Sequence, residues 1–217
     1  MTHGFDIAFA QPPLRQSVAF AIAPFDGFTG ERVVRGVTAR IDGLSDLPVR
    51  NVSGMLVFTD LPMQPVYTIR IDAAVAGYFN PPATSIAAGD PSGTPFPVAL
   101  GRLPSRGHPD DATLVRGLVQ RAGVTVANAQ VVAALDPPPP GATPFATRSD
   151  GAGSFAIALR LPRLAPGEQE APYGVLVSVT DSVGTAIYPG QVRGGRAHRF
   201  AAPLDLASAA TPSLDQI

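Results

Sequence analysis

The chain has no cysteine, no tryptophan and no lysine, and it has only three histidines in 217 residues. Without cysteine it can form no disulfide, thiolate nucleophile or zinc–thiolate site. Without lysine it cannot carry the phosphate-binding loop in which a lysine follows the glycines. His3, His108 and His198 stand far apart, which is not the spacing of a metal site or catalytic cluster. We expect surface or linker positions for all three, and no metal, cofactor or catalytic residue.

Charge is scarce as well. Charged residues make up 15% of the chain and the net charge is −1 at pH 7, whereas soluble domains average about 25% charged residues. All 16 basic residues are arginines, spread from Arg15 to Arg199 without a dense cluster. Because a nucleic-acid-binding protein gathers basic charge on one face, we expect no nucleic-acid partner. The low charge instead favours coverage of part of the surface by a protein partner, and it leaves a homo-oligomer open.

Long apolar runs are absent too. The longest, "VAFAIAPF" at 18–25, is far too short to cross a bilayer. The opening "MTHGFDIAFAQPP" lacks the basic start and long apolar stretch of a secretion signal. We therefore expect no membrane insertion and a cytoplasmic location by default, with a place in a secreted or particle-bound assembly left open.

Glycine and proline are plentiful, at 22 and 24 residues. They interrupt the chain every ~8–12 residues, a spacing typical of short strands joined by turns. "YTIRID" at 67–72 and "VLVSVT" at 175–180 alternate apolar with other residues, as half-buried strands do. These patterns predict an all-β protein. The expected strands are 17–23, 32–41, 54–58, 66–73, 96–100, 113–121, 131–135, 145–148, 154–161, 173–180 and 198–203.

The strands fall into two groups on either side of the polar segment "LPSRGHPDDAT". We predict an N-terminal arm at 1–16, a first β-sandwich at 17–102, a linker at 103–112, a second β-sandwich at 113–206 and a flexible tail at 207–217.

The two groups also resemble each other in order and spacing, which indicates a tandem repeat of one β-sandwich unit. The matched segments are 32–41 with 113–122, 50–62 with 148–162, and 66–73 with 173–181. In this alignment Val52 stands opposite Asp150.

The stretch "LVRGLV…VANAQVVAAL…ATRSDGAGSFAIALRLP" resembles the carboxypeptidase regulatory-like module, and "FDGFTGERVVRGVTARI" with "DLPMQPVYTIRIDAAVAGYFNPP" is similar to this module and its transthyretin-like relatives. The resemblance covers roughly 17–205. It implies two tandem immunoglobulin/prealbumin-like antiparallel β-sandwich domains, and it says little about function because such modules are attached to many unrelated proteins.

The glycine-rich loop "RSDGAGSF" at 148–155 has three interpretations: a calcium loop, a phosphate loop or a turn. A calcium loop needs further oxygen ligands at alternate positions, where Ala152 and Ser154 stand. A type I turn needs only Asp150 at its start and Gly153 at its end. We predict the turn.

Enzymes with related β-sandwich folds carry sequence motifs that this chain lacks. The resemblance to transthyretin-related ureide hydrolases would imply a C-terminal Tyr-Arg-Gly-Ser, and intradiol dioxygenases would need His-x-His; neither occurs, nor does a Gly-x-Ser-x-Gly nucleophile motif. We predict a non-catalytic structural or interaction protein, with a place in a phage-tail-like particle as one hypothesis. A ligand- or carbohydrate-binding accessory module is the alternative, although the absence of tryptophan weakens it.

Three stretches are candidate partner surfaces. "FDIAF" alternates Phe5, Ile7 and Phe9 and fits a strand arm that docks on its own sandwich or on a neighbour. "AGYFNPP" places Tyr78 and Phe79 beside a turn, either as core residues or as contact residues. "DPPPPGATP" includes Pro138 and Pro139 and fits a stiff, exposed hairpin loop or a polyproline ligand.

Overall fold

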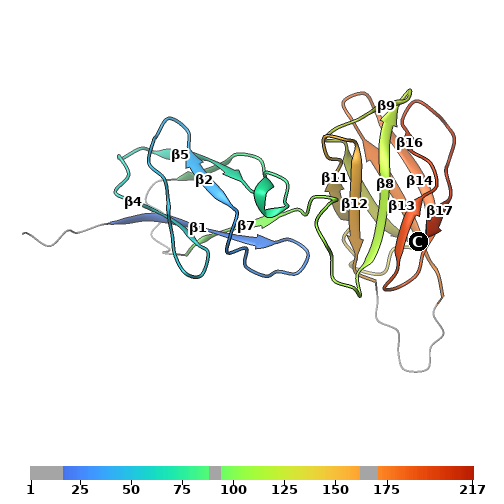
Figure 1. Cartoon of the computed structure of the whole chain (residues 1–217), viewed down its shortest axis with the longest axis horizontal. Helices are drawn as coiled ribbons and strands as arrows, with labels where there is room; N and C mark the ends of the chain where they lie inside the picture. The colour runs from blue at the N-terminus through green and yellow to red at the C-terminus, as the bar shows by residue number, and fades with distance from the viewer. Residues whose placement is uncertain (1–16, 88–93, 162–170) are drawn as a thin grey trace, which may run out of the picture.

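The computed structural model of the chain describes residues 17–87, 94–161 and 171–217. In these residues the chain is all-β, with one short 3₁₀-helix and no α-helix (Figure 1). Two hydrophobic cores, one in each half of the chain, are each enclosed by two sheets. The predicted fold class, two tandem β-sandwiches, is confirmed.

The first sandwich has one sheet in the order β3-β4-β1-β7 and a facing sheet in the order β2-β5-β6. Its core includes Phe20, Phe58 and Tyr67, whose rings lie against one another. The elements are β1 (Val18–Asp26), β2 (Thr38–Ile41), β3 (Val49–Arg50), β4 (Leu56–Thr59), β5 (Val66–Asp72), the 3₁₀-helix η1 (Ala74–Ala76), β6 (Thr84–Ala87) and β7 (Phe96–Leu100).

The second sandwich has one sheet in the order β12-β8-β15-β17, with β9 and β16 also paired to β8, and a facing sheet in the order β11-β10-β13-β14. Its elements are β8 (Thr113–Arg121), β9 (Val124–Thr125), β10 (Gln130–Asp136), β11 (Phe145–Arg148), β12 (Ser154–Leu159), β13 (Tyr173–Thr180), β14 (Thr185–Val192), β15 (Ala197–Phe200), β16 (Leu204–Asp205) and β17 (Leu214–Gln216).

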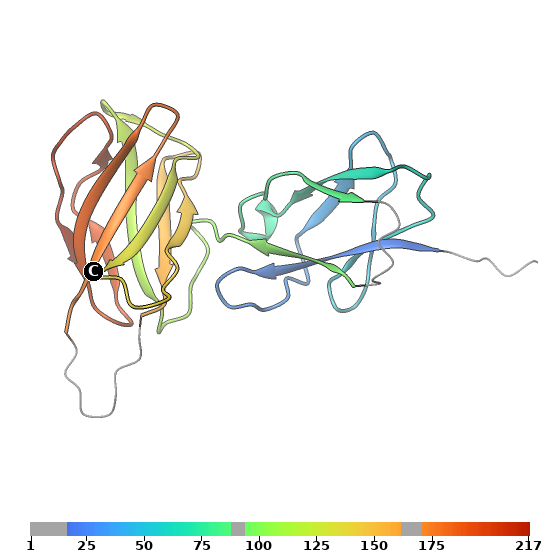
Figure 2. The same cartoon turned by 180° about the vertical axis from the view of Figure 1, so that it is seen from behind.

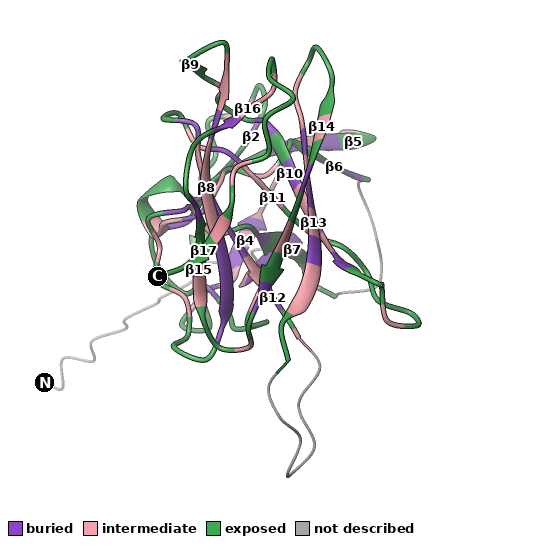
Figure 3. Cartoon of the chain, turned by 90° about the vertical axis from the view of Figure 1, so that its right-hand side faces the viewer, coloured by how far each residue is buried: buried purple, intermediate pink, exposed green. Residues whose placement is uncertain are grey.

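The alternation read from the sequence appears as burial. In β5, Tyr67, Ile69 and Ile71 are buried while the residues between them are not. The valines of β13 are buried in the same way. In β12 Phe155, Ile157 and Leu159 are buried as expected, and Ala156 between them is buried as well. Figure 3 shows the burial along the strands and the exposure of the loops. Period-2 patterning therefore locates the core faces correctly.

The two sandwiches are set crosswise. In Figures 1 and 2 strands β1 and β7 run toward the second sandwich, whose strands β8 and β12 stand across that direction. The first sandwich thus presents one end to β11 and β12, the edge strands of the two sheets of the second sandwich. Phe155 and Ile157 of β12 belong to the core of the second sandwich, so Ala156 between them lies on the opposite face of the strand. Ala156 is buried all the same, and it lines the cleft between the two sandwiches.

The repeat is real, but one of its predicted matches is wrong. Strand β1 pairs antiparallel with β4 and parallel with β7, as β8 pairs antiparallel with β12 and parallel with β15. The counterpart of β8 is therefore β1 and not the segment 32–41. Both segments contain Val-Arg-Gly, but the two glycines have different roles. Gly36 has a φ of 72° and lies outside any strand. Gly117 lies in the middle of β8, where an added Cβ would be 2.6 Å from the Phe155 ring.

The loop "RSDGAGSF" is the predicted turn. The Asp150 Oδ1 accepts hydrogen bonds from the backbone N–H of Ala152 and Ser154, both at 2.9 Å, and Gly153 has a φ of 78°. The first repeat has the same turn, in which the Asn51 Oδ1 accepts from Ser53 and Met55.

The counterpart of Asp150 is thus Asn51 rather than Val52, because the glycine that closes the first turn is Gly54, with a φ of 80°. The alignment predicted from the sequence was one residue out of register. The side-chain oxygen is kept in both repeats, and its role is to accept backbone hydrogen bonds.

Strand β17 contradicts the predicted flexible tail. Leu214–Gln216 pair antiparallel with β15, and Leu214 packs against Gly190 of β14, where an added Cβ would lie 2.8 Å from its Cδ2. Strand β17 can pack here because Gly190 of the facing sheet has no side chain and leaves room for Leu214.

Replacing Asp150 by alanine is expected to lower the free energy of unfolding by about 1 kcal/mol, because two turn N–H groups lose their acceptor. Asp150→Asn retains an acceptor oxygen and should stay close to wild type in urea denaturation. Millimolar Ca²⁺ should leave the melting temperature unchanged. A Ca²⁺-dependent rise that Asp150→Ala abolishes would restore the metal interpretation.

Candidate functional site

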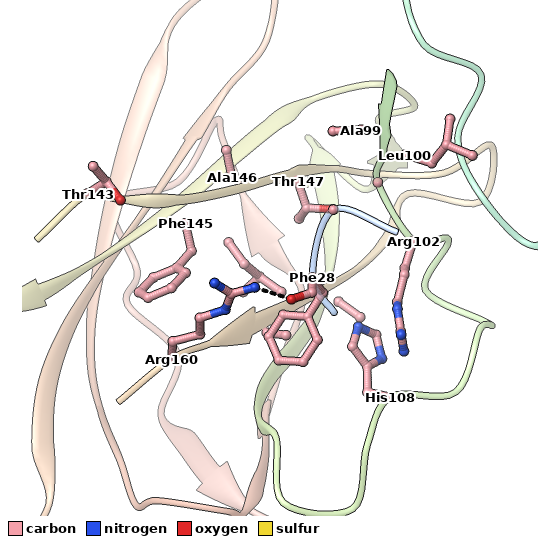
Figure 4. Close-up of a pocket in the computed structure, with 15 residues that line it drawn as sticks. Phe28, Ala99, Leu100, Arg102, His108, Thr143, Phe145, Ala146, Thr147 and Arg160 are labelled. Carbon is pink, nitrogen blue, oxygen red and sulfur yellow. Dashed lines mark hydrogen bonds between the residues drawn. The ribbon is translucent and has the colours of Figure 1, made fainter. Parts of the chain in front are cut away.

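Polar and aromatic side chains from both halves of the chain gather around a cleft of about 420 Å³ between the two sandwiches (Figure 4). Both halves of the chain line it, the first through the loop after β1 and the end of β7, and the second through β11 and β12. The lining residues with polar or aromatic side chains are Phe28, Arg102, His108, Thr143, Phe145, Thr147 and Arg160.

Phe28 stands at the centre of this junction. The guanidinium groups of Arg102 and Arg160 lie 5.8 and 5.4 Å from the centre of its ring, and the centre of the His108 imidazole lies 6.0 Å away in a T-shaped arrangement. Arg160 also donates a hydrogen bond to the Phe28 carbonyl oxygen, which Figure 4 marks. Cation–π contacts of this kind gain strength when they are shielded from water. A residue of the first sandwich is therefore clamped by an arginine of the second.

Asp26, two residues before Phe28, holds the loop in place. Asp26 is 2% exposed, and its carboxylate accepts four hydrogen bonds. One oxygen accepts from the backbone N–H of Phe28 and Thr29, at 2.8 and 3.0 Å. The other accepts from the Tyr78 hydroxyl at 2.8 Å and from Arg102 Nε at 2.7 Å. Because this carboxylate is fully bonded, it is a structural centre with little capacity left for a substrate or metal.

The ionisation of this network follows from its burial. Burial disfavours the charged form of Asp26, but the four hydrogen bonds outweigh it and hold the pKa of the carboxyl below its ordinary value. Burial and the hydrogen bond to Asp26 raise the pKa of Tyr78 to about 12. Burial and the charges of Arg102 and Arg116 lower the pKa of His108 to about 4. At pH 7 the junction thus holds a carboxylate, a neutral phenol and a neutral imidazole.

Two more arginines of the second sandwich reach across the junction. Arg148 Nη2 donates to the Asn80 carbonyl oxygen at 2.6 Å, and its guanidinium lies 4.7 Å from the centre of the Phe79 ring. Arg116 Nη1 donates to the Pro104 carbonyl oxygen at 2.9 Å. Arginine suits these contacts because its planar cation can stack and donate at once.

The predicted partner-surface residues differ in how far they are exposed. Tyr78 is 1% exposed, so the core interpretation of this residue is right and it offers no surface to a partner. Phe79 is half-buried under Arg148. Pro138 is exposed and Pro139 half-buried, in the loop of the β10–β11 hairpin, as predicted. Phe5, Ile7 and Phe9 lie outside the described residues.

The histidine predictions need one correction. His198 is buried, with its Nε2 accepting the backbone N–H of Arg193 at 3.0 Å, whereas we expected a surface position. It faces inward because it alternates with the exposed Arg199 in β15. His108 is half-buried in the segment between the sandwiches, and His3 lies outside the described residues.

The sequence did not single out Asp26 or Phe28. A local signal existed, because "FDGFTG" places an aspartate at the end of an apolar strand and before two glycines, a typical turn start. The long-range partners, Arg102 and Arg160, have no such signal.

Within residues 17–87, 94–161 and 171–217, no three His, Asp or Glu side chains gather as a metal site would require. In the same ranges, no helix has the length and apolarity needed to cross a membrane.

No protein-family model matches the chain, and no curated protein matches its sequence. Among solved structures, the Bacillus anthracis TIE protein has 11% identity and a TM-score of 0.34, and the match covers 91% of this chain and 34% of that one. A streptococcal ancillary pilin has 10% identity and a TM-score of 0.30, with coverage of 94% and 63%. The chain thus spans about a third of the first protein and less than two thirds of the second.

Proposed function

We propose that this chain is a non-catalytic structural or interaction protein, whose two β-sandwiches are held as one rigid unit within a larger protein assembly. The observation that carries the proposal is the clamp on Phe28. A flexible tether would need no buried Asp26 beneath the loop and no arginines from the second sandwich stacked on first-sandwich rings. Such a junction fixes the direction in which one sandwich presents the other.

The groups with altered pKa values support a non-catalytic role. Asp26 has all its hydrogen bonds within the protein, and the Tyr78 hydroxyl is bound to it. The Nδ1 of His108 is buried and has no partner among the described residues. Shifted pKa values often mark an active site, but here Asp26 and Tyr78 are bonded to each other, and the pKa of His108, which lines the cleft, is lowered to about 4, which makes it a weak base at pH 7.

The finer proposal is that both sandwiches are carboxypeptidase regulatory-like or transthyretin-like modules in a secreted or particle-bound assembly, such as a phage-tail-like particle. The conserved order of strands in the two repeats supports a modular origin. Affinity purification of the chain from its source cells, followed by mass spectrometry, tests this proposal. Recovery of a stoichiometric partner supports it, and recovery of the chain alone under several extraction conditions argues against it.

The cleft itself favours a second candidate, a ligand- or carbohydrate-binding accessory module. Phe28, Phe145 and Arg160 give it aromatic and cationic walls, and a volume of about 420 Å³ lies in the range of small-molecule sites. Reproducible binding on a glycan array that Phe145→Ala abolishes would favour this function over the structural one.

Replacing Phe28 by alanine is expected to loosen the junction and leave both sandwiches folded, because the clamp loses its central ring but neither core loses a member. The absence of cysteine makes spin labelling simple. Labels at Met63→Cys and Val183→Cys, both exposed, should give a narrow distance distribution in the parent and one at least twice as broad with Phe28→Ala. The matched control is Leu47→Ala, an exposed apolar residue of the first sandwich. Equal widths in all three proteins would contradict a clamp.

A further inference from the structure

A second groove, of about 440 Å³, lies on the first sandwich between residues 31–36 and the 3₁₀-helix η1. Four arginines line it: Arg32, Arg35, Arg102 and Arg106. They come from two separate parts of the chain, residues 32–35 and 102–106, so the fold creates a cluster where the sequence showed only scattered arginines.

The groove has an excess of positive charge that the described residues do not neutralise. Arg32 and Arg35 are exposed, and neither forms an ion pair or hydrogen bond with any residue in the described ranges. Of the two acidic residues in the lining, Asp26 is already bonded to Arg102, and Glu31 is exposed to solvent. As far as the described residues go, two guanidinium groups are therefore available to bind carboxylate, phosphate or sulfate oxygens.

The remaining walls are aliphatic. Val34 is 44% exposed and Val75 is 89% exposed, and both line the groove. The one aromatic ring in the lining, Tyr78, is covered by the Arg106 guanidinium at 4.2 Å, and its hydroxyl is bonded to Asp26. A sugar would find no open aromatic face to stack on. A peptide that alternates acidic and aliphatic side chains would meet both kinds of wall.

We propose that this groove binds an acidic peptide segment of a partner protein, with carboxylates on Arg32 and Arg35 and aliphatic side chains against Val34 and Val75. The proposal rests on the proposed function, because it names the chemistry of the partner in the assembly. Arginine favours such a partner since its planar fork can hold a carboxylate through two parallel hydrogen bonds.

Fluorescence anisotropy with the full chain tests the proposal. The probe is a fluorescein-labelled hexapeptide of alternating Glu and Leu, compared with the same peptide carrying Gln for Glu and with a sulfated hexasaccharide. Arg32→Ala/Arg35→Ala should weaken binding of the acidic peptide at least tenfold. The control Arg193→Ala/Arg196→Ala removes the same charge from two exposed arginines of the second sandwich and should change the affinity less than twofold. Binding should also weaken markedly between 50 and 500 mM NaCl, because exposed charges are screened.

Three outcomes would overturn the inference: no binding of the acidic peptide, equal loss in both double variants, or binding of the hexasaccharide in preference to the peptide. Circular dichroism and thermal melting check that the variants are folded, and Arg32→Gln/Arg35→Gln removes the charge but keeps a polar side chain if the alanine variants are not. Partner capture by affinity purification is read separately. If a partner is captured but the peptide titration shows no binding, the proposed peptide site in this groove is wrong and the proposed function is unaffected.

Discussion

Asp26→Ala is expected to lower the free energy of unfolding by about 3–5 kcal/mol, the usual cost of removing one partner of a buried ion pair. The carboxylate accepts hydrogen bonds from Arg102, Tyr78 and two backbone N–H groups. Its removal leaves the Arg102 cation, only 11% exposed, without its counter-charge. Urea denaturation followed by circular dichroism measures the change.

Asp42→Ala is the matched control, because Asp42 forms an ion pair of similar length, 2.8 Å, with Arg70 on the exposed surface. Exposed pairs contribute little to stability, so this variant should unfold close to wild type. Similar losses for the two variants would mean that the Asp26 network has no special role in the first sandwich.

The same network gives a pH dependence of defined sign. Since the folded-state pKa of Asp26 lies below its ordinary value, its stabilisation is present above the unfolded-state pKa, about 4, and is lost as pH falls through the folded value. The stability difference between wild type and Asp26→Asn should therefore be constant from pH 5 to 8 and shrink below about pH 4. A difference that grows on acidification would contradict an ionised Asp26.

Gly153→Ala is expected to lower the free energy of unfolding by about 2–4 kcal/mol. Two costs combine: an alanine held at a φ of 78° is strained by roughly 1 kcal/mol, and its Cβ would lie 2.7 Å from the Val119 carbonyl oxygen, which must move. That carbonyl belongs to β8, the central strand of the sheet.

Gly151→Ala tests the assignment within the same loop. Gly151 has no atom within 4 Å of an added Cβ and no positive φ, so its replacement should alter stability by less than about 0.5 kcal/mol. Gly54→Ala, in the equivalent turn of the first repeat, should be as damaging as Gly153→Ala, since its Cβ would lie 2.6 Å from the Val34 Cα. Equal losses of stability for Gly151→Ala and Gly153→Ala would show that the turn changes conformation to accommodate an alanine at position 153.

How far the sequence predicts this structure depends on the range of the interactions involved. Alternation in β5, β12 and β13 is local, and these strands lie close to their predicted places. Strand β14 was missed because Pro189 and Gly190 interrupt its pattern. It tolerates a proline because it is an edge strand, where a missing N–H breaks no ladder on its outer side.

The junction could not be predicted in this way. Phe28 and Arg160 are 132 residues apart, and stacking of an arginine on a ring leaves no periodic pattern in either segment. The turn at Asp150 was found because its requirements, an acceptor and a glycine three residues later, are contained in one stretch of chain.

The parallel pairing of β1 with β7 has a mechanical consequence. Strand β1 enters the first sandwich at its free end, and β7 leaves it toward the second sandwich (Figure 1). Tension along the chain would pull these two neighbours in opposite directions along their own axes. Their contacts, from Ile22 opposite Phe96 to Asp26 opposite Leu100, would be loaded in shear and would have to break together instead of unzipping one at a time. Such an arrangement suits a segment that must bear load.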